Sequence, residues 1–326
     1  MLVPILLFIL GLALLVKGGD WFVDGATGIA HRFHIPEILI GATVVSIGTT
    51  LPEVMVSATS AYSGHGEMAY GNAIGSIICN TSLIAAVTVA IRPSKVDRDA
   101  IKLPVLFFFL AAVFYAAIAY FYGEFSRLVG LVLLAIFATY MVLSVRRTKG
   151  ALKKDTKTLN TEEKQDAPKG AVLKDIVLLV VGAALIAVGA DLLVDNGTLI
   201  AQKLGVPESV IALTFVALGT SLPELVTAIT SLVKGHGALS LGNVIGANLF
   251  NLVLVSGISV VISPFSVPSS STVANINTSL LVDIPLMFVV MLLLTIPALC
   301  QGKLSRIQGI CLLAIYAAFC TFQFMI

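Results

Sequence analysis

The sequence has few charged residues. Only 12% of its 326 residues are Asp, Glu, Lys or Arg, whereas 58% are hydrophobic, and the mean hydropathy is +1.02. Soluble domains average about 25% charged residues, so a water-soluble globular protein is excluded. The formal net charge of +2 indicates no particular partner, because the placement of positive charge matters more than its sum in a membrane protein. We expect no nucleic-acid ligand.

Cysteine and nucleotide-binding motifs are also scarce. The four cysteines, Cys79, Cys300, Cys311 and Cys320, lie in apolar stretches without paired spacing. We therefore expect neither a disulfide framework nor a thiolate metal site. The sequence has no P-loop and no soluble nucleotide-binding domain, which excludes an ATP-driven pump.

Long apolar runs, in contrast, recur along the whole chain. About 20 apolar residues span a hydrocarbon core roughly 30 Å thick. Ten such spans can be delimited: 2–24, 37–63, 67–91, 101–122, 126–146, 171–200, 208–234, 238–263, 276–300 and 304–325. The first lacks the basic region and cleavage site of a signal peptide, so we interpret it as a span. The sequence predicts an all-α polytopic membrane protein with ten transmembrane helices.

One long polar segment, Arg146–Lys174, separates the spans into two groups of five. It mixes Lys with Asp and Glu and contains Pro168 and Gly170, a composition typical of a solvated linker. We therefore predict a first five-helix unit over residues 1–146, a linker over 147–170 and a second five-helix unit over 171–326.

The basic residues predict the orientation of the spans. Seventeen Lys and Arg residues fall in the loops on one side, and only Arg127 and Lys203 fall on the other. The positive-inside rule makes the first side cytoplasmic. Both termini are then outside, which in a bacterium is the periplasm.

A shift of 171 positions aligns the two halves without a gap. It carries the segment GTTLPE at 48–53 onto GTSLPE at 219–224, and the Gly-His-Gly turn at 64–66 onto the one at 235–237. It likewise carries Gly71-Asn72, Gly75 and Asn80 onto Gly242-Asn243, Gly246 and Asn251. Because the shift covers five spans, the second half must cross the membrane in the opposite sense. Inverted repeats are typical of secondary transporters, whose substrate site lies near the midplane where the halves meet.

Two carboxylates occupy equivalent positions in these halves. Glu53 and Glu224 lie near the middle of the second and seventh spans, where a charge costs about 2.5 to 3.5 kcal/mol on insertion scales. The structural alternative is a pair of protonated, hydrogen-bonded carboxyls. The functional interpretation is that both bind one hard cation.

Neighbouring residues favour the cation. Thr49 and Thr220 precede the glutamates by four residues, which places hydroxyl and carboxylate on one helix face. The intervening prolines, Pro52 and Pro223, leave carbonyls without a helical donor. The third and eighth spans add Ser76, Asn80 and Asn251. Oxygen ligands without His or Cys suit Ca²⁺ or Na⁺, although the asparagines could instead form interhelical hydrogen bonds. We expect Gly71, Gly75, Gly242 and Gly246 to permit close helix packing, and the two Gly-His-Gly turns to be surface hairpins.

The two Gly-Thr-[Thr/Ser]-Leu-Pro-Glu segments are each followed by Gly-Asn and then by Gly-[Ser/Ala]-x-x-x-Asn. They resemble the paired alpha repeats of the sodium/calcium exchanger family, within the cation/calcium antiporter superfamily. The resemblance spans both halves, and the size and linker are similar to those of bacterial inner-membrane members. It implies an antiporter rather than an enzyme, with cation sites on the second, third, seventh and eighth helices. The ligands implied are the central carboxylates of Glu53 and Glu224, hydroxyls or carbonyls of Thr49, Thr50, Thr220 and Ser221, backbone carbonyls of Ser46 and Ala217, and the side chains of Ser76, Asn80 and Asn251.

Two positions depart from the family pattern. Ala247 stands where a serine is frequent, so one oxygen is missing, and Asn251 stands where some relatives have Asp, so the site carries two carboxylates. Both departures bear on the binding of an additional cation and on potassium dependence.

We therefore expect a secondary antiporter of the bacterial inner membrane that exchanges Ca²⁺ for Na⁺ at one midplane site. Exchange of Ca²⁺ for protons, a cation channel and a non-transporting cation sensor are the alternatives. No cofactor is expected beside the transported Ca²⁺ and Na⁺. The expected partners are the lipid bilayer and inorganic cations, and the sequence does not identify which proteins, if any, bind the chain.

Overall fold

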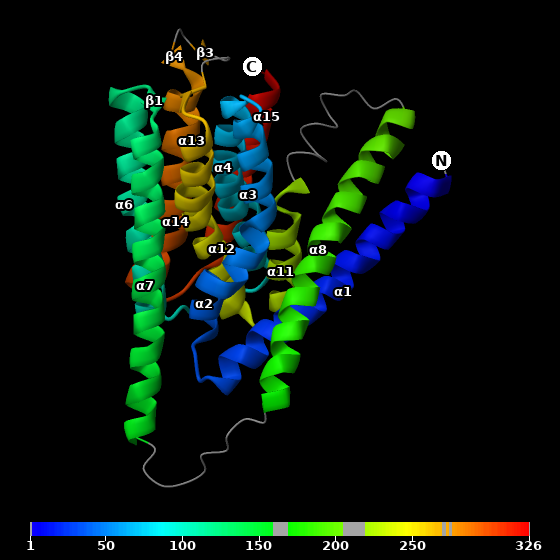
Figure 1. Ribbon diagram of the computed structural model, residues 1–326, viewed down its shortest axis with the longest axis vertical. Coiled ribbons are helices and arrows are strands. Elements are labelled where there is room, and N and C mark those ends of the chain that lie inside the picture. The colour runs from blue at the N-terminus through cyan, green and yellow to red at the C-terminus, as the bar shows by residue number, and fades with distance from the viewer. Residues whose placement is uncertain (1, 159–168, 205–218, 269–271, 274–275, 326) are drawn as a thin grey trace.

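The computed structural model describes residues 2–158, 169–204, 219–268, 272–273 and 276–325. Nearly all of the described elements are helices (Figure 1). In the first half they are α1 (Leu2–Arg32), α2 (Glu37–Ile40), η1 (Gly41–Val45), α3 (Ser46–Tyr62), α4 (Gly66–Cys79), η2 (Asn80–Ala85), α5 (Ala86–Ile91), α6 (Arg98–Phe121) and α7 (Arg127–Thr158). In the second half they are α8 (Lys169–Lys203), α11 (Leu222–Val233), α12 (Gly237–Phe250), η4 (Asn251–Val255), α13 (Ser256–Ile262), η5 (Ser279–Asp283), α14 (Ile284–Gln301) and α15 (Arg306–Met325).

Short antiparallel pairings lie outside the helices. The strand β1 (Glu124–Phe125) pairs with β2 (Phe265–Ser266), and β3 (Thr272–Val273) pairs with β4 (Ile276–Asn277). An isolated bridge joins Lys95 to Lys303. The 171-residue shift carries Lys95 onto Ser266. The Lys95–Lys303 bridge therefore follows the third span of the first half, and the β1–β2 pairing follows the equivalent span of the second half.

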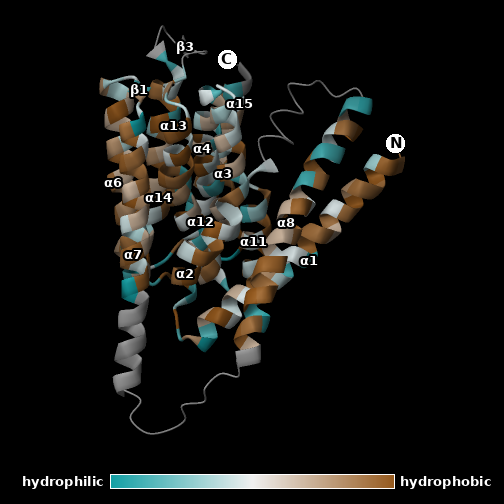
Figure 2. Ribbon diagram, viewed as in Figure 1, coloured by the Kyte–Doolittle hydropathy of each residue, from teal (hydrophilic) through white to brown (hydrophobic). Residues whose placement is uncertain are grey.

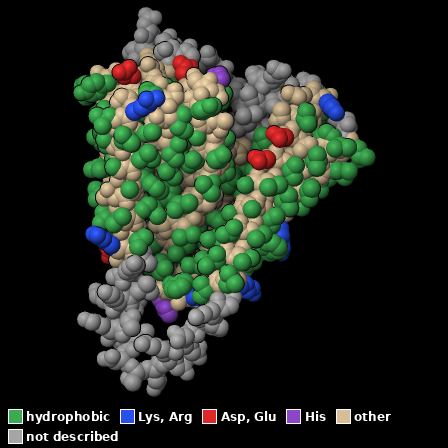
Figure 3. All heavy atoms as spheres, in the orientation of Figure 1, with side chains coloured by type: hydrophobic (Ala, Val, Ile, Leu, Met, Phe, Trp, Pro, Cys, Tyr) green, Lys and Arg blue, Asp and Glu red, His purple; other side chains and the backbone are tan. Residues whose placement is uncertain are grey.

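The predicted all-α membrane fold with ten transmembrane helices in two inverted repeats is confirmed. Nine helices in the described residues are long and apolar enough to cross a membrane, and α11 is a shorter apolar helix. Apolar residues predominate along the helices (Figure 2), and hydrophobic side chains are spread over the face of the bundle drawn in Figure 3. The beginning of the predicted seventh span, residues 208–218, lies outside the described residues.

Some predicted boundaries differ from the structure. α1 continues to Arg32, beyond the predicted end of the first span at residue 24. α7 continues to Thr158, so the first part of the predicted linker is helical. The division into units 1–146, 147–170 and 171–326 remains a prediction.

The inversion is visible in two equivalent helical hairpins. The α3–α4 turn contains Gly64, with a φ of +80°, and the α11–α12 turn contains Gly235, with a φ of +87°. The first turn lies against β2, since a Cβ on Gly66 would be 2.3 Å from the Cβ of Phe265. The second lies against α2. The strand β2 pairs with β1 at one end of the bundle, whereas α2 lies towards the other end. The two hairpins therefore turn at opposite ends (Figure 1). The Gly-His-Gly segments are thus hairpin turns, as predicted.

Three spans change from α-helix to π-helix within their length, in η1, η2 and η4. Asn80 is the first residue of η2 and Asn251 is the first residue of η4, and the 171-residue shift relates these two positions. π-helical turns are rare in proteins overall, and those that do occur often lie at functional sites. Asn80 and Asn251, which begin these two pseudo-symmetric π-turns, are therefore candidate functional residues.

Close helix contacts depend on glycine at a few positions. A Cβ on Gly246 would lie 2.2 Å from Ser46 Oγ, and one on Gly242 would lie 2.2 Å from the Ile38 carbonyl oxygen. The predicted close packing is therefore confirmed for these two. Gly71 and Gly75 have no described atom within 4 Å of such a Cβ. Residues 209–217, which the shift equates with Ile38–Ser46, lie outside the described residues, so the prediction for this second pair stays untested.

α1 and α8 form a separate, tightly packed pair. A Cβ on Gly182 would lie 2.5 Å from the Phe22 nitrogen, and one on Gly11 would lie 2.8 Å from the Gly189 carbonyl oxygen. The two helices run side by side, and one end of the pair diverges from the rest of the bundle (Figure 1). The fold thus consists of a helical core and one helix pair packed along its side.

Candidate cation site

Glu53 on α3 and Glu224 on α11 are fully buried. Their carboxylates lie close enough to interact electrostatically. None of their four carboxylate oxygens has a hydrogen-bond partner among the described residues. An uncompensated buried charge is strongly destabilising. The arrangement therefore requires a bound cation or protons to compensate the two carboxylates.

Hydroxyl groups of the first repeat lie beside the carboxylate of the second. Thr49 and Thr50 lie beside the Glu224 carboxyl. Ser221 Oγ lies 3.5 Å from Ser76 Oγ on α4. The 171-residue shift relates Ser221 to Thr50 and Ser76 to Ala247, which has no hydroxyl. Thr50 therefore lacks the contact that Ser221 makes with Ser76. Accordingly, the Thr50 hydroxyl is buried without a hydrogen-bond partner in the described part of the chain.

The predicted asparagines begin π-turns that pack against the helices of the glutamates, η2 against α11 and η4 against α3. Asn80 and Asn251 are both fully buried at the start of their π-turns. Neither side-chain amide has a hydrogen-bond partner within the described ranges. The prediction left open whether they form interhelical hydrogen bonds, and no such bond is present among the described residues. Their amide oxygens are free to bind a ligand.

Sequence reasoning missed two other asparagines, Asn72 and Asn243. The Thr49 hydroxyl donates to Asn243 Oδ1 at 3.2 Å, and the Thr220 hydroxyl donates to Asn72 Oδ1, also at 3.2 Å. Asn72 Nδ2 in turn donates to Ser57 Oγ at 2.8 Å. The signal was present, because the 171-residue shift carries Asn72 onto Asn243.

The backbone at the two prolines differs between the repeats. α3 continues through Pro52, whereas Pro223 lies in the first turn of α11 and Thr220 and Ser221 form a turn before it. The predicted opening of the helix before proline is therefore visible as an interruption in the second repeat only.

Of the two positions predicted to contribute backbone carbonyls, Ser46 lies in the described part of the chain. Ser46 is buried, and its hydroxyl donates to the carbonyl oxygens of Gly41 at 2.7 Å and Asn243 at 3.0 Å. This side chain is therefore engaged in joining the repeats. Ala217 lies outside the described residues.

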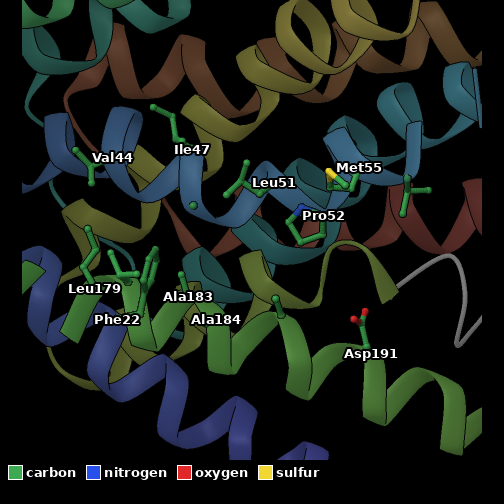
Figure 4. Close-up of a pocket in the computed structure, with 14 residues that line it drawn as sticks. Phe22, Val44, Ile47, Leu51, Pro52, Met55, Leu179, Ala183, Ala184 and Asp191 are labelled. Carbon is green, nitrogen blue, oxygen red and sulfur yellow. The ribbon is translucent and has the colours of Figure 1, made fainter. Parts of the chain in front are cut away.

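A cavity of about 740 Å³ separates α8 from α3 (Figure 4). Leu179, Ala183 and Ala184 line it from α8, and Leu51 and Pro52 line it from α3. A small neighbouring cavity of about 10 Å³ is bordered by Pro52, Thr49 and Pro223. The candidate site therefore lies next to the place where the α1–α8 pair separates from the core.

The side chains brought together are carboxylates, amides and hydroxyls. Such oxygen ligands suit hard cations, whereas zinc and copper sites use imidazole or thiolate ligands. The arrangement can therefore bind Ca²⁺ or Na⁺ between the two repeats.

Comparisons with known proteins agree with this chemistry. The sequence profile of a family described as "Sodium/calcium exchanger protein" matches residues 3–146 and 174–325. The chain is 32% identical to the sodium/calcium exchanger MaX1 of Methanosarcina acetivorans over 99% of both chains, and 36% identical to the inner membrane protein YrbG of Escherichia coli over 87% of both. A solved structure of the sodium-calcium exchanger NCX_Mj, soaked with Na⁺ and Sr²⁺, matches with a TM-score of 0.82 at 33% identity over 97% of each chain.

Proposed function

Because the chain belongs to the sodium/calcium exchanger family and is therefore a cation/Ca²⁺ antiporter, we propose that Na⁺ is the ion it exchanges for Ca²⁺. One observation carries the proposal. The carboxylates of Glu53 and Glu224 are buried together, and their oxygens have no hydrogen-bond partner among the described residues. A hard cation supplies the missing partner for all four oxygens.

The proposed ligands are the oxygens around these carboxylates. Glu53 and Glu224 provide the charge, and the neutral ligands complete the coordination shell. These are the hydroxyl or carbonyl oxygens of Thr49, Thr50, Thr220, Ser221 and Ser76, the amide oxygens of Asn80 and Asn251, and the backbone carbonyls of Ser46 and Ala217. Asn72 and Asn243 position the ligands, because each accepts a hydrogen bond from a proposed ligand threonine.

Charge balance couples the two ions. Two ionised glutamates carry a charge of −2, which one Ca²⁺ or two Na⁺ neutralise. A neutral, occupied site can cross between the inward-facing and outward-facing states, whereas an empty site would expose two unpaired carboxylates to a low dielectric. Each crossing therefore requires a bound ion, and the gradient of one ion drives the other.

The α1–α8 pair is the element that moves in this proposal. Its two helices are held together by close backbone contacts at glycines, and a large cavity separates α8 from α3. Protein interiors are normally close-packed, so this gap leaves α8 and α3 with little direct packing where the cavity lies. Movement of the pair across it would expose the ions to one side of the membrane at a time.

Equilibrium binding of ⁴⁵Ca²⁺ to the purified protein tests the proposed site. Na⁺ should displace Ca²⁺, with a dependence steeper than first order because two Na⁺ replace one Ca²⁺. Glu53→Gln and Glu224→Gln should each abolish Ca²⁺ binding. Asp283→Asn, which removes a carboxylate elsewhere in the bundle, is the matched control and should bind normally. Displacement of Ca²⁺ by falling pH but not by Na⁺ would favour Ca²⁺/H⁺ exchange instead.

A further inference from the structure

Two histidines and a glutamate from distant parts of the sequence meet away from the candidate cation site. His31 lies in the last turn of α1, Glu37 is the first residue of α2, and His236 precedes α12. Glu37 Oε1 lies 2.8 Å from His236 Nδ1 and 3.5 Å from His31 Nε2. The three ligand atoms lie within 4.8 Å of one another.

This geometry is close to that of a tetrahedral metal site. Zinc bonds of about 2.0 to 2.2 Å in a tetrahedron place neighbouring ligand atoms roughly 3.4 Å apart. The Glu37–His31 distance already agrees, and small side-chain rotations would adjust the other two. Two imidazoles and one carboxylate form a zinc ligand set that leaves a fourth position for water. Imidazole favours Zn²⁺, Ni²⁺ or Cu²⁺ over Ca²⁺, so the cluster differs in kind from the all-oxygen site.

The backbone holds these ligands in place without a metal. Gly235, with its φ of +87°, forms the turn before His236, and the His236 nitrogen donates to the Ser231 carbonyl at 2.7 Å. After α1, the Ile35 nitrogen donates to the Ala30 carbonyl at 2.8 Å. The site would therefore require little ordering on binding.

Nearby positive charges are already neutralised. Arg32, which follows His31, forms an ion pair with Asp175 on α8. Lys234, two residues before His236, lies 2.7 Å from Asp24 Oδ1 and 3.4 Å from Asp20 Oδ1. The side chains of His31, Glu37 and His236 are 71%, 21% and 27% exposed, respectively, so an ion can reach them from solvent.

We infer that His31, Glu37 and His236 form a binding site for a divalent transition metal, with Zn²⁺ as the representative ion, at the junction of α1, α2 and the α11–α12 turn. A metal there links the end of α1 to the helical core. Since the proposed transport cycle requires the α1–α8 pair to move against that core, occupancy should slow exchange. This second consequence rests on the proposed function, whereas metal binding does not.

Binding of Zn²⁺ to the full-length protein in detergent tests the site, with saturating Ca²⁺ present to occupy the transport site. The wild type should bind one Zn²⁺ per chain, and Co²⁺ in its place should give the absorption spectrum of nitrogen and oxygen ligands. His31→Ala and His236→Ala should each weaken binding by about 10-fold or more, since even residues behind the ligands affect metal affinity by that much. His31 is largely exposed, so its variant should fold.

His65→Ala is the matched control. His65 precedes α4 in the equivalent Gly-His-Gly turn at the other end of the bundle, and its loss should leave Zn²⁺ affinity unchanged. Glu53→Gln should also retain Zn²⁺ binding. Failure of the wild type to bind Zn²⁺, unchanged affinity in His31→Ala and His236→Ala, or loss of binding in Glu53→Gln would each overturn the site. If Zn²⁺ binds as expected but exchange rates do not change, the metal site stands and the mobility of the α1–α8 pair is contradicted.

Discussion

Thr49 donates a hydrogen bond to Asn243 across the interface between the two repeats, with 3.2 Å between Thr49 Oγ1 and Asn243 Oδ1. Thr220 makes the same contact with Asn72 at the same distance. Both pairs are related by the 171-residue shift, so one interaction occurs twice by pseudo-symmetry. Each amide fixes the hydroxyl hydrogen of its threonine, which leaves the threonine oxygen lone pairs available for a cation.

The first prediction concerns these two asparagines. Asn72→Ala and Asn243→Ala should each weaken Ca²⁺ binding by about 10- to 100-fold, the usual cost of removing a group that orients a metal ligand. Isothermal titration calorimetry of the purified variants measures the effect. Asn196→Ala is the control, because Asn196 on α8 donates to the Leu192 carbonyl within its own helix. Wild-type affinity in both test variants would show that the threonines need no such support.

The second prediction concerns stability without ions. Glu53→Gln removes one of two buried carboxylates that interact electrostatically and whose oxygens have no hydrogen-bond partner among the described residues, so the ion-free variant should melt at a higher temperature than the ion-free wild type. Ca²⁺ at 100 times its Kd should stabilise the wild type by about 2.7 kcal/mol and should not stabilise the variant. Thermal unfolding in detergent, with and without Ca²⁺, measures both. A variant that melts lower and still responds to Ca²⁺ contradicts the assignment.

The third prediction uses the asymmetry between Ser76 and Ala247. Ala247→Ser should place a hydroxyl near Thr50, whose own hydroxyl has no partner within the described residues. We expect Na⁺ to displace Ca²⁺ at an about fivefold lower concentration, equivalent to roughly 1 kcal/mol for one added polar interaction. Ser76→Ala, which removes the equivalent hydroxyl from the first repeat, should have the opposite effect. If neither variant changes the Na⁺ dependence, these positions do not contribute to ion selectivity.

The fourth prediction concerns orientation. Reporters fused after Lys149 and after Lys303 should be cytoplasmic, whereas one fused at the C-terminus should be periplasmic. The reason is the excess of Lys and Arg in the loops on one side of the spans. Paired alkaline phosphatase and green fluorescent protein fusions distinguish the two sides. A cytoplasmic C-terminal reporter would be incompatible with the predicted orientation.

Much of the fold was predictable because the two halves of the sequence share recognisable motifs at one constant spacing. The 171-residue shift identified Glu53 and Glu224 as equivalent residues, and the length of the apolar runs identified the spans. The π-turns at Asn80 and Asn251 were not predictable, since the intervals between apolar residues do not reveal a change from α- to π-helix.

Contacts between the repeats required the three-dimensional structure. The shift marked Asn72 and Asn243 as equivalent, but their bonds to Thr220 and Thr49 depend on how α4 and α12 pack against the opposite repeat. The contact between His236 and Glu37 joins residues 199 positions apart. No local pattern links them, and only the folding of α12 against α2 brings them together.

The most direct test of the account is ⁴⁵Ca²⁺ efflux from loaded proteoliposomes with wild-type protein. External Na⁺ should accelerate efflux steeply, external choline should not, and Glu224→Gln should abolish the Na⁺ response. Efflux in the absence of any counter-ion would indicate a channel. If efflux is indifferent to Na⁺ at every concentration but follows an imposed pH gradient, Na⁺ coupling is wrong and the protein exchanges Ca²⁺ for protons.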